Sequence, residues 1–436
     1  MSGSDDPLKA LARAIERIEE LLERLPLDVA KDVRSRIATL RTLLLDKRPP
    51  ALVLVGRRGA GKSSVVNALF GAKVAELGHV TAQTGRGRWY DYTREGGSMS
   101  ILDTRGLQEG APPAEHDPAR SALESIAVEL RIKAPDLIVF IAKAADVDAA
   151  IDANLDALEH VLDEVRRAHR VQPPLIVVVT HCDLLEPKSV ALPTASGPAS
   201  TQPKEDIDEK MRNVTLAEQA IARRVDARAS LRDRRVTTIG VSAYMSWRPN
   251  GSLRADERWR IDDLAVALFR QLPDAGRAEL ARATRTRAVQ EELASTLTKA
   301  TAAICAAIAA APIPVADIVT LTALQAGLVA GIAWIGGRSI DTRGTAEFLG
   351  SVGANVGMAF ALREAVRALL KIVAPGGGPV VSAAIAFSGT MAIGAAARAY
   401  YIRGLSIEDA RRAFRRKKTG GSAEKESPID RDDPKG

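Results

Sequence analysis

The chain has 436 residues, enough for two or three domains that each bury a core of their own. The net charge is +7 at pH 7, and Lys and Arg residues gather near the C-terminus. Two cysteines, Cys182 and Cys305, argue against a disulfide framework and favour a reducing compartment. Residues 1–20 are acidic and charged rather than apolar, so we expect no secretory signal there.

Two apolar stripes at helical spacing predict an N-terminal helical hairpin. The first stripe consists of Leu8, Leu11, Ile15, Ile18, Leu22 and Leu25, and the second of Val29, Val33, Ile37, Leu40 and Leu44. Asp6 and Pro7 are typical of a helix start, and Pro49 with Pro50 ends the second helix. We expect the hairpin to pack on the next domain, with a homodimer contact as the alternative.

A phosphate-binding loop is predicted directly after the apolar run Ala51–Val55. The pattern G-x-x-x-x-G-K-[ST] supplies nine candidate nucleotide-binding residues: Gly56, Arg57, Arg58, Gly59, Ala60, Gly61, Lys62, Ser63 and Ser64. Glycines let backbone N–H groups curl around a phosphate, and the start of the following helix adds its dipole. Lys62 can reach the outer phosphates, and the Ser63 hydroxyl can ligate Mg²⁺. The strand before the loop and the helix after it favour this interpretation over a chance match.

Further predicted strands complete an α/β domain. They are Arg88–Tyr92, Met99–Leu102, Pro135–Ile141, Pro174–Val179 and Thr237–Val241. The near-continuous apolar runs are expected of parallel strands that are covered on both faces, and helical patterns lie between them. We therefore predict a doubly wound, mostly parallel sheet whose ligands bind at the carboxyl ends of its strands.

Three motifs at later strand ends indicate a guanine nucleotide. Asp103-x-x-Gly106 can hold a Mg²⁺-bound water through Asp103 and contact the γ-phosphate through the Gly106 N–H. In Thr180-His181-Cys182-Asp183, the Asp183 carboxylate can accept two N–H bonds from guanine, whereas adenine would leave it unpaired. A backbone N–H of Ser242-Ala243 can meet the guanine O6. The predicted nucleotide is GTP.

These motifs resemble the Era-like and dynamin-like branch of the P-loop GTPases (TRAFAC class), over about residues 51–272. GKSSVVNALFG is similar to the first box of that group, DTRG to the third, THCD to the fourth and SA to the fifth. The resemblance implies GTP and Mg²⁺ as ligands and GTP hydrolysis as the activity. It also implies a second-box threonine on Mg²⁺, for which Thr84 is our choice and Thr81 the alternative. The implied metal ligands are then Ser63, Thr84 and Asp103.

Two positions depart from that family's pattern. His181 stands where [NT]-K-x-D carries a lysine, so weaker stacking on the base is expected. Leu107 follows Gly106 where Ras-type enzymes carry a water-orienting glutamine. Members of the family that lack this glutamine orient water by other means. We therefore expect slow hydrolysis, with Lys62 and Thr84 as the catalytic residues.

The composition shifts near Arg277 to helices rich in alanine, glycine and valine. This region resembles the domain of unknown function that follows the G domain in inner-membrane-associated bacterial GTPases. The similar residues are Pro312–Asp317, Leu324, Gln325, Leu328, Ile332–Gly337, Thr390–Gly394, Tyr400 and Tyr401. An alanine-rich soluble bundle is the alternative.

Two stretches in this region, Ile318–Gly337 and Pro379–Ala397, carry no charged residue and have about the 20 residues needed to span a membrane. Their alanine and glycine content makes the free energy of transfer into lipid small. The basic cluster Arg411–Lys418 would meet an anionic cytoplasmic surface. We therefore predict a location at the cytoplasmic face of the inner membrane, peripheral or integral, with the cytoplasm as the alternative.

The predicted organisation is a helical hairpin (1–48), a GTP-binding domain (49–272), an apolar helical domain (273–405) and a basic, disordered tail (406–436). We expect a membrane-associated switch whose partners are GTP and GDP and an anionic inner-membrane surface, with a second copy of the chain as a further candidate partner. The alternatives are a dynamin-like assembly and remodelling GTPase, a soluble GTPase with a helical effector domain, an RNA-associated GTPase, and nucleotide binding without turnover. The apolar C-terminal region favours no specific nucleic acid.

Overall fold

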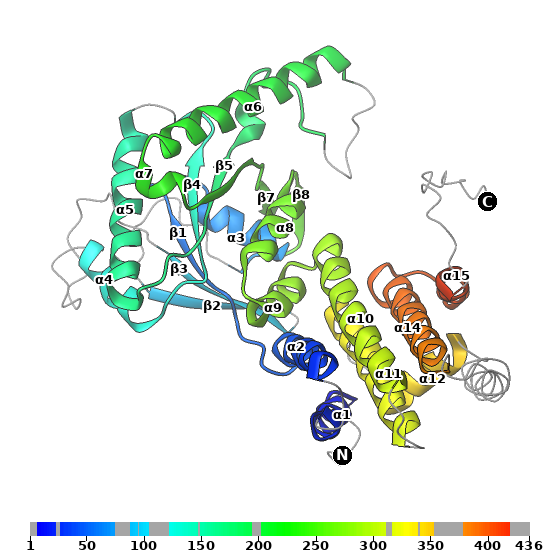
Figure 1. Ribbon diagram of the computed structural model, residues 1–436. Coiled ribbons are helices and arrows are strands. Elements are labelled where there is room, and N and C mark those ends of the chain that lie inside the picture. The colour runs from blue at the N-terminus through cyan, green and yellow to red at the C-terminus, as the bar shows by residue number, and fades with distance from the viewer. Residues whose placement is uncertain are drawn as a thin grey trace, which may run out of the picture. The chain divides into compact units, whose positions relative to one another are not determined.

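The computed structural model describes residues 7–22, 27–74, 88–94, 96–103, 122–146, 149–193, 202–310, 316–338, 341–352 and 378–418 (Figure 1). The chain divides into two compact units. One unit consists of Thr39–Leu293 with Ile335–Gly337 and contains the sheet. The other consists of Met1–Ala38, Ala294–Trp334 and Arg338–Gly436 and is helical where it is described. The four domain boundaries expected from the sequence stay a prediction.

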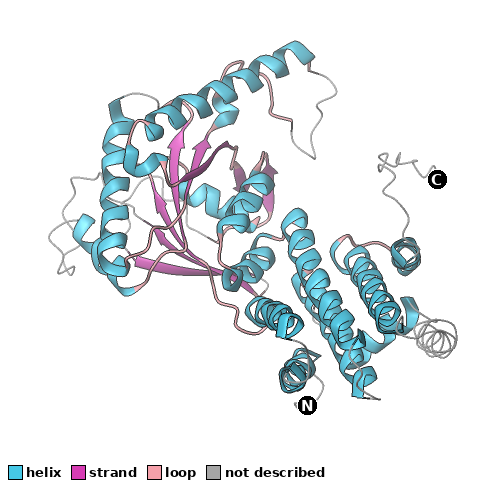
Figure 2. Ribbon diagram, in the orientation of Figure 1, coloured by secondary structure: helices cyan, strands magenta, loops and turns pink. Residues whose placement is uncertain are grey.

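Six strands form one sheet in the order β2-β3-β1-β4-β5-β6 (Figure 2). The strands are β1 (Ala51–Val55), β2 (Arg88–Arg94), β3 (Gly97–Asp103), β4 (Leu137–Lys143), β5 (Leu175–Thr180) and β6 (Arg235–Gly240). Only the edge pair of β2 and β3 is antiparallel. This confirms the predicted α/β fold with a mostly parallel sheet.

The central strands β1, β4 and β5 are apolar because helices cover both faces of the sheet. All side chains of β1 and β5 are buried. Where β1 begins, the Asp136 carboxylate accepts the Ala51 N–H at 2.8 Å and two guanidinium N–H groups of Arg48 at 2.6 and 2.7 Å. This pairing holds the pKa of Arg48 above its usual value. The amino ends of β1 and β4 are thereby fixed, and the carboxyl ends carry the site.

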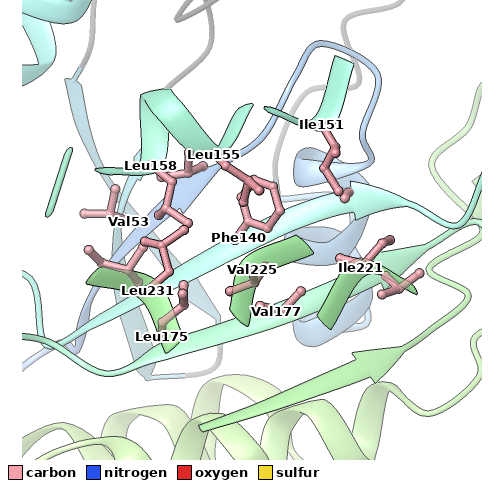
Figure 3. Close-up of a cluster of buried hydrophobic side chains, with 14 of the residues drawn as sticks. Val53, Phe140, Ile151, Leu155, Leu158, Leu175, Val177, Ile221, Val225 and Leu231 are labelled. Carbon is pink, nitrogen blue, oxygen red and sulfur yellow. The ribbon is translucent and has the colours of Figure 1, made fainter. Parts of the chain in front are cut away.

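One face of the sheet packs against α4 (Ala122–Ile132), α5 (Ala149–His169), α6 (Lys204–Asp226) and the short α7 (Ala229–Arg232). Figure 3 shows the core between them, where Phe140 of β4 lies close to Leu155 of α5, and Val177 of β5 lies near Val225 of α6. All four side chains are fully buried. Such a core is the largest favourable contribution to the folding of the unit.

The opposite face carries α3 (Lys62–Phe70), α8 (Ile261–Gln271) and α9 (Asp274–Thr284) (Figure 1). Helix α9 lies against the start of β3 so closely that a Cβ atom on Gly97 would stand 2.3 Å from the Ala283 nitrogen. The buried Glu279 accepts the N–H and the hydroxyl of Ser98, at 2.9 and 3.0 Å. The sheet unit therefore extends beyond residue 272.

A short hairpin follows β6 and has no counterpart among the elements expected from the sequence. It consists of β7 (Met245–Trp247) and β8 (Leu253–Asp256), which pair antiparallel. Its turn contains Gly251 at φ 81°, a conformation that favours glycine. Ser242 and Trp259 exchange backbone hydrogen bonds of 3.2 and 3.0 Å, so both ends of the hairpin are tied to the end of β6.

The helical unit is built around two apolar helices, α11 (Ala316–Ile335) and α14 (Gly378–Ala397). The Gln325 amide donates to the Thr390 hydroxyl at 3.0 Å, which satisfies two buried polar groups between them. The remaining elements of the unit are α1 (Pro7–Leu21), most of α2 (Leu27–Leu44), the end of α10 (Arg287–Ala310), α12 (Thr342–Val352), the π-helical turn η3 (Arg398–Ile402) and α15 (Ile407–Lys418). The helical hairpin expected at the N-terminus is thus present as two helices.

Candidate functional site

The glycine-rich loop has a backbone that only glycine accommodates at three positions. A Cβ atom on Gly56 would lie 2.2 Å from the carbonyl oxygen of Ile141 on β4. Gly59 and Gly61 have φ values of +76° and +92°, in the left-handed region that other residues avoid. The loop therefore curls between the end of β1 and the start of α3, as a phosphate cradle requires.

Lys62 is the first residue of α3 and lies inside this curl. Its side chain is only 6% exposed, and its Nζ donates to the carbonyl oxygens of Gly56 and Arg57 at 2.5 and 3.1 Å. The Arg57 guanidinium pairs with Asp146, which follows β4, at 3.5 Å. Ser63 and Ser64 follow on the first turn of α3 and are half-buried. The ammonium group of Lys62 thus stands within the loop, where the sequence motif predicts it.

Thr180 joins the end of β5 to the glycine-rich loop. Its hydroxyl donates to the Ala60 carbonyl at 2.7 Å and lies 2.9 Å from Nδ1 of His181. His181 has φ 58°, and its Cε1 would be 3.4 Å from a Cβ atom on Gly61. Burial, together with the charge of Lys143, lowers the pKa of His181 from its usual value, so the folded state favours the neutral ring.

A cavity of about 820 Å³ opens from the glycine-rich loop toward Asp183. Its walls come from the loop and α3, from the Thr180–Asp183 motif, and from the β7–β8 hairpin with the residues before it. The lining residues are Gly61, Ser64, Lys73, Thr180, His181, Asp183, Ala243, Tyr244, Met245, Ser246, Trp247, Arg248, Pro249, Gly251 and Arg254. The structure thus brings the predicted phosphate and base motifs to one cavity, and the hairpin adds a wall that sequence reasoning missed.

Of the predicted pair Ser242 and Ala243, only Ala243 lines the cavity. The Ser242 N–H donates to the Trp259 carbonyl at 3.2 Å, and its side chain is fully buried. The backbone contact to the guanine O6 that the sequence predicts for this pair stays a prediction, and Ala243 is the member of the pair that lies at the cavity.

Lys210 of α6 supports the base motif and was not among the predicted residues. Its buried Nζ donates to the backbone carbonyls of Asp183, Leu185 and Pro187 at 2.7, 3.0 and 3.2 Å. Burial lowers the pKa of Lys210 from its usual value. One ammonium group thus satisfies three carbonyls of the segment that follows β5. A lysine on a charged helix ordinarily lies in solvent, so the sequence carried no signal for this role.

Some of the predicted residues are only partly placed. Thr84, Thr81 and Gly106 lie outside the described residues. Asp103 is the last residue of β3 and pairs with Leu54 of β1, two residues before Gly56. Asp103 is thus placed at the carboxyl edge of the sheet that the cavity shares, and its role on Mg²⁺ stays a prediction.

The left-handed glycines fit a polyphosphate, and the half-buried carboxylate of Asp183 in the same cavity fits a base with paired N–H donors. A Ser63 hydroxyl on the first turn of α3 fits a metal bound to phosphate oxygens. The six-stranded sheet, the loop and the strand-end motifs together define a P-loop GTPase domain.

Residues 51–181 match the family described as 50S ribosome-binding GTPase. The chain is 28% identical over 193 residues to the tRNA modification GTPase MnmE of Xanthomonas campestris pv. campestris (strain B100), a match that covers 43% of this chain and 38% of that protein. It is 33% identical over 163 residues to the small ribosomal subunit biogenesis GTPase RsgA of Xanthomonas oryzae pv. oryzae (strain PXO99A), covering 35% and 44% respectively. The chain thus spans less than half the length of these curated relatives.

Solved structures that match part of the chain include Toc33 from Arabidopsis thaliana in complex with GDP and Mg²⁺. That match has 17% identity and a TM-score of 0.32, and it covers 53% of this chain and 88% of Toc33. Era in complex with MgGDPNP and nucleotides 1506–1542 of 16S ribosomal RNA matches with 15% identity and a TM-score of 0.29, covering 59% and 67%.

Proposed function

We propose that this protein binds GTP with Mg²⁺ and hydrolyses the nucleotide slowly, as a switch associated with the inner membrane. One observation carries the nucleotide part of the proposal: Gly61 of the phosphate loop and Asp183 of the base motif line the same cavity. The match of residues 51–181 to a GTPase family supports it.

The chain's own residues divide the work in the proposed reaction. The loop N–H groups and Lys62 bind the phosphates, and the Lys62 ammonium group exchanges its present carbonyl partners for phosphate oxygens. The Asp183 carboxylate accepts two N–H groups of guanine, and Lys210 keeps the backbone beneath it in place. Ser63, Thr84 and Asp103 would hold Mg²⁺, which neutralises phosphate charge. Acceleration comes from positioning and electrostatics rather than from covalent chemistry.

Base preference tests the proposal. Wild-type protein is titrated with fluorescent GTP and fluorescent ATP, and the same titrations are repeated on Asp183→Asn with xanthosine triphosphate added. We expect a clear preference for GTP that moves toward xanthosine triphosphate in the variant, because each lost charge-assisted hydrogen bond costs about 1.5–3 kcal/mol. Equal affinity of the wild type for GTP and ATP would refute the proposal.

The membrane part of the proposal draws on the helical unit. By length and composition alone, two described helices are apolar enough to cross a bilayer, Arg287–Ala310 and Val380–Ile402. The two spans predicted from the sequence are Ile318–Gly337 and Pro379–Ala397. The second overlaps the candidate helix Val380–Ile402, whereas the first corresponds to the shorter apolar stretch Thr320–Ile335. Core helices of soluble proteins pass the same test, so the argument needs the surface of α14 as well.

Helix α14 leaves part of its apolar surface uncovered. Val380 is 71% exposed and Phe387 is 41% exposed, seven residues apart and thus on one face of the helix. Helix α15, which contacts α14, exposes Arg411, Arg412, Arg415, Arg416 and Lys417. An apolar helix face next to a basic helix suits an anionic lipid surface, where each Lys or Arg contributes about 1 kcal/mol.

Two measurements test the membrane part. Cells are fractionated and the membranes washed with carbonate, which releases a peripheral protein and leaves an integral one. Purified full-length protein is also mixed with vesicles of neutral lipid, with and without anionic lipid. A protein that stays in the cytosolic fraction and does not bind anionic vesicles would refute this part and favour a soluble GTPase with a helical effector domain.

The names of MnmE and RsgA favour an RNA-associated role as a second candidate. The matched region covers less than half of each relative, and the RNA-related roles in those names belong to the whole proteins. Co-sedimentation of the protein with ribosomal subunits in the presence of a non-hydrolysable GTP analogue would favour this candidate. A turnover rate per molecule that rises with protein concentration would favour a dynamin-like assembly GTPase instead.

A further inference from the structure

Lys143 of β4 lies beside the base motif, which has a histidine, His181, in place of its usual lysine. Lys143 is the last residue of β4, and in the sheet it pairs with Thr180, directly before His181. The Nζ of Lys143 would be 3.6 Å from a Cβ atom on Gly59, at the turn of the phosphate loop. Position 181 holds a histidine in place of the motif's lysine. A cation therefore still reaches the phosphate loop, although from β4 rather than from the base motif.

The surroundings of Lys143 point to a role in nucleotide binding rather than in packing. Its side chain is half-buried, and among the residues that the structure describes no hydrogen-bond or ion-pair partner is recorded for its ammonium group. The nearby Asp146 carboxylate pairs with Arg57. The His181 ring lies against Gly61, on the same loop. A half-buried, unneutralised ammonium group beside a phosphate loop is unfavourable until an anion binds there.

We propose that Lys143 replaces the lysine missing at position 181: its ammonium group lies beside the turn at Gly59 and attracts the polyphosphate of the bound nucleotide. This inference rests on the proposed function. The neutral ring of His181 agrees with this replacement, because a positive charge at position 181 would be repelled by the ammonium group of Lys143.

The experiment measures the dissociation constant of GDP for full-length protein in the wild type, Lys143→Gln, Lys143→Arg and Lys204→Gln. Lys204 is exposed at the start of α6 and serves as the matched loss of one positive charge. We expect Lys143→Gln to weaken GDP binding about tenfold, Lys143→Arg to retain most of the affinity, and Lys204→Gln to match the wild type. The deficit of Lys143→Gln should shrink at about 1 M salt, where charges are screened within about 3 Å.

Two further readouts separate this role from a purely structural one. By NMR, the pKa of the His181 ring should rise in Lys143→Gln, because a neighbouring positive charge has been removed. The exchange variant Lys143→Gln with His181→Lys should recover affinity relative to Lys143→Gln alone. Wild-type affinity in Lys143→Gln, or an exchange variant that binds GDP no more tightly than Lys143→Gln, would overturn the inference. Failure of the wild type to bind guanine nucleotides would instead overturn the proposed function.

Discussion

The ammonium group of Lys210 donates a 2.7 Å hydrogen bond to the backbone carbonyl of Asp183, the residue that reads the base in the proposed function. The same group also holds the carbonyls of Leu185 and Pro187. The carboxylate is thus placed by a side chain of α6, twenty-seven residues further along the chain. Base recognition therefore depends on how α6 packs as well as on the motif itself.

Replacing Lys210 with methionine tests this support. The variant leaves three partly buried carbonyls without this donor, so the free energy of unfolding should fall by about 1–3 kcal/mol and GTP affinity with it. Urea unfolding and nucleotide titration measure the two effects. Lys204→Met, an exposed change on the same helix, is the control and should alter neither. Unchanged GTP affinity in Lys210→Met would contradict the link between the helix and the base.

Alanine at Gly56 and at Gly59 should have unequal effects. At Gly56 the new Cβ atom would lie 2.2 Å from the Ile141 carbonyl, so β1 and β4 must move apart at a cost of about 1–3 kcal/mol or more. At Gly59 the cost is the left-handed backbone alone, about 1–2 kcal/mol. Thermal unfolding should therefore show Gly56→Ala as the less stable variant. The reverse order would disprove the close approach of the loop to β4.

His181 should make stability depend on pH in a defined direction. Its pKa is lowered in the folded state, chiefly by burial, whereas in the unfolded chain it is about 6.5. The unfolded state therefore binds the proton first, and the free energy of unfolding falls as pH drops through about 6.5 until the folded pKa is reached. His181→Asn should lose less stability than the wild type between pH 7.5 and 5.5, as measured by urea unfolding. Parallel curves for the two proteins would count against a buried, neutral ring.

Binding and turnover separate the roles of the two predicted catalytic residues, Lys62 and Thr84. Lys62→Ala should abolish tight GTP binding, whereas Thr84→Ala should spare binding and slow a hydrolysis rate that is already on the order of 10⁻² s⁻¹ or below. Nucleotide titration measures the binding, and single-turnover phosphate release measures the hydrolysis. If Thr84→Ala hydrolyses GTP at the wild-type rate and Thr81→Ala is inactive, the switch threonine is Thr81.

The contact of α9 with β3 predicts where the sheet unit ends. A fragment of residues 39–272 lacks the Glu279 carboxylate and exposes the surface at Gly97 that Ala283 covers. We expect the fragment 39–293 to unfold cooperatively and at higher urea than 39–272. In the full-length chain, Glu279→Gln should lower stability because one strong acceptor of two Ser98 hydrogen bonds is lost. Equal midpoints for the two fragments would show that α9 is dispensable.

The phosphate loop could be predicted because its chemistry is local: Gly56, Gly59 and Gly61 are needed by one turn, and the turn follows directly from a buried strand. The placement of Asp183 and Ala243 at one cavity was likewise predictable, because the carboxyl ends of parallel strands meet at one edge. The central strands of the sheet followed from their apolar runs.

The supporting residues could not be predicted in the same way. Lys210 and Lys143 act on residues far away in sequence, and a lysine on a helix or at a strand end is usually solvated. The hairpin formed by Met245–Trp247 and Leu253–Asp256 is too short to show a clear alternation of polar and apolar residues. Helix α9 is rich in alanine, so its composition resembles the helices that follow, although its contacts lie with the sheet.

The hydrogen bond from the Thr180 hydroxyl to the Ala60 carbonyl connects the phosphate loop directly to the base motif. A ligand that pulls on the phosphate loop therefore also strains the turn that carries His181 and Asp183. The effects of substitutions in the phosphate loop and in the base motif on the free energy of nucleotide binding should then not be additive, because the conformation of each segment depends on the other. In the proposed function, loss of the terminal phosphate should therefore weaken the contacts to the base as well as those to the phosphate loop.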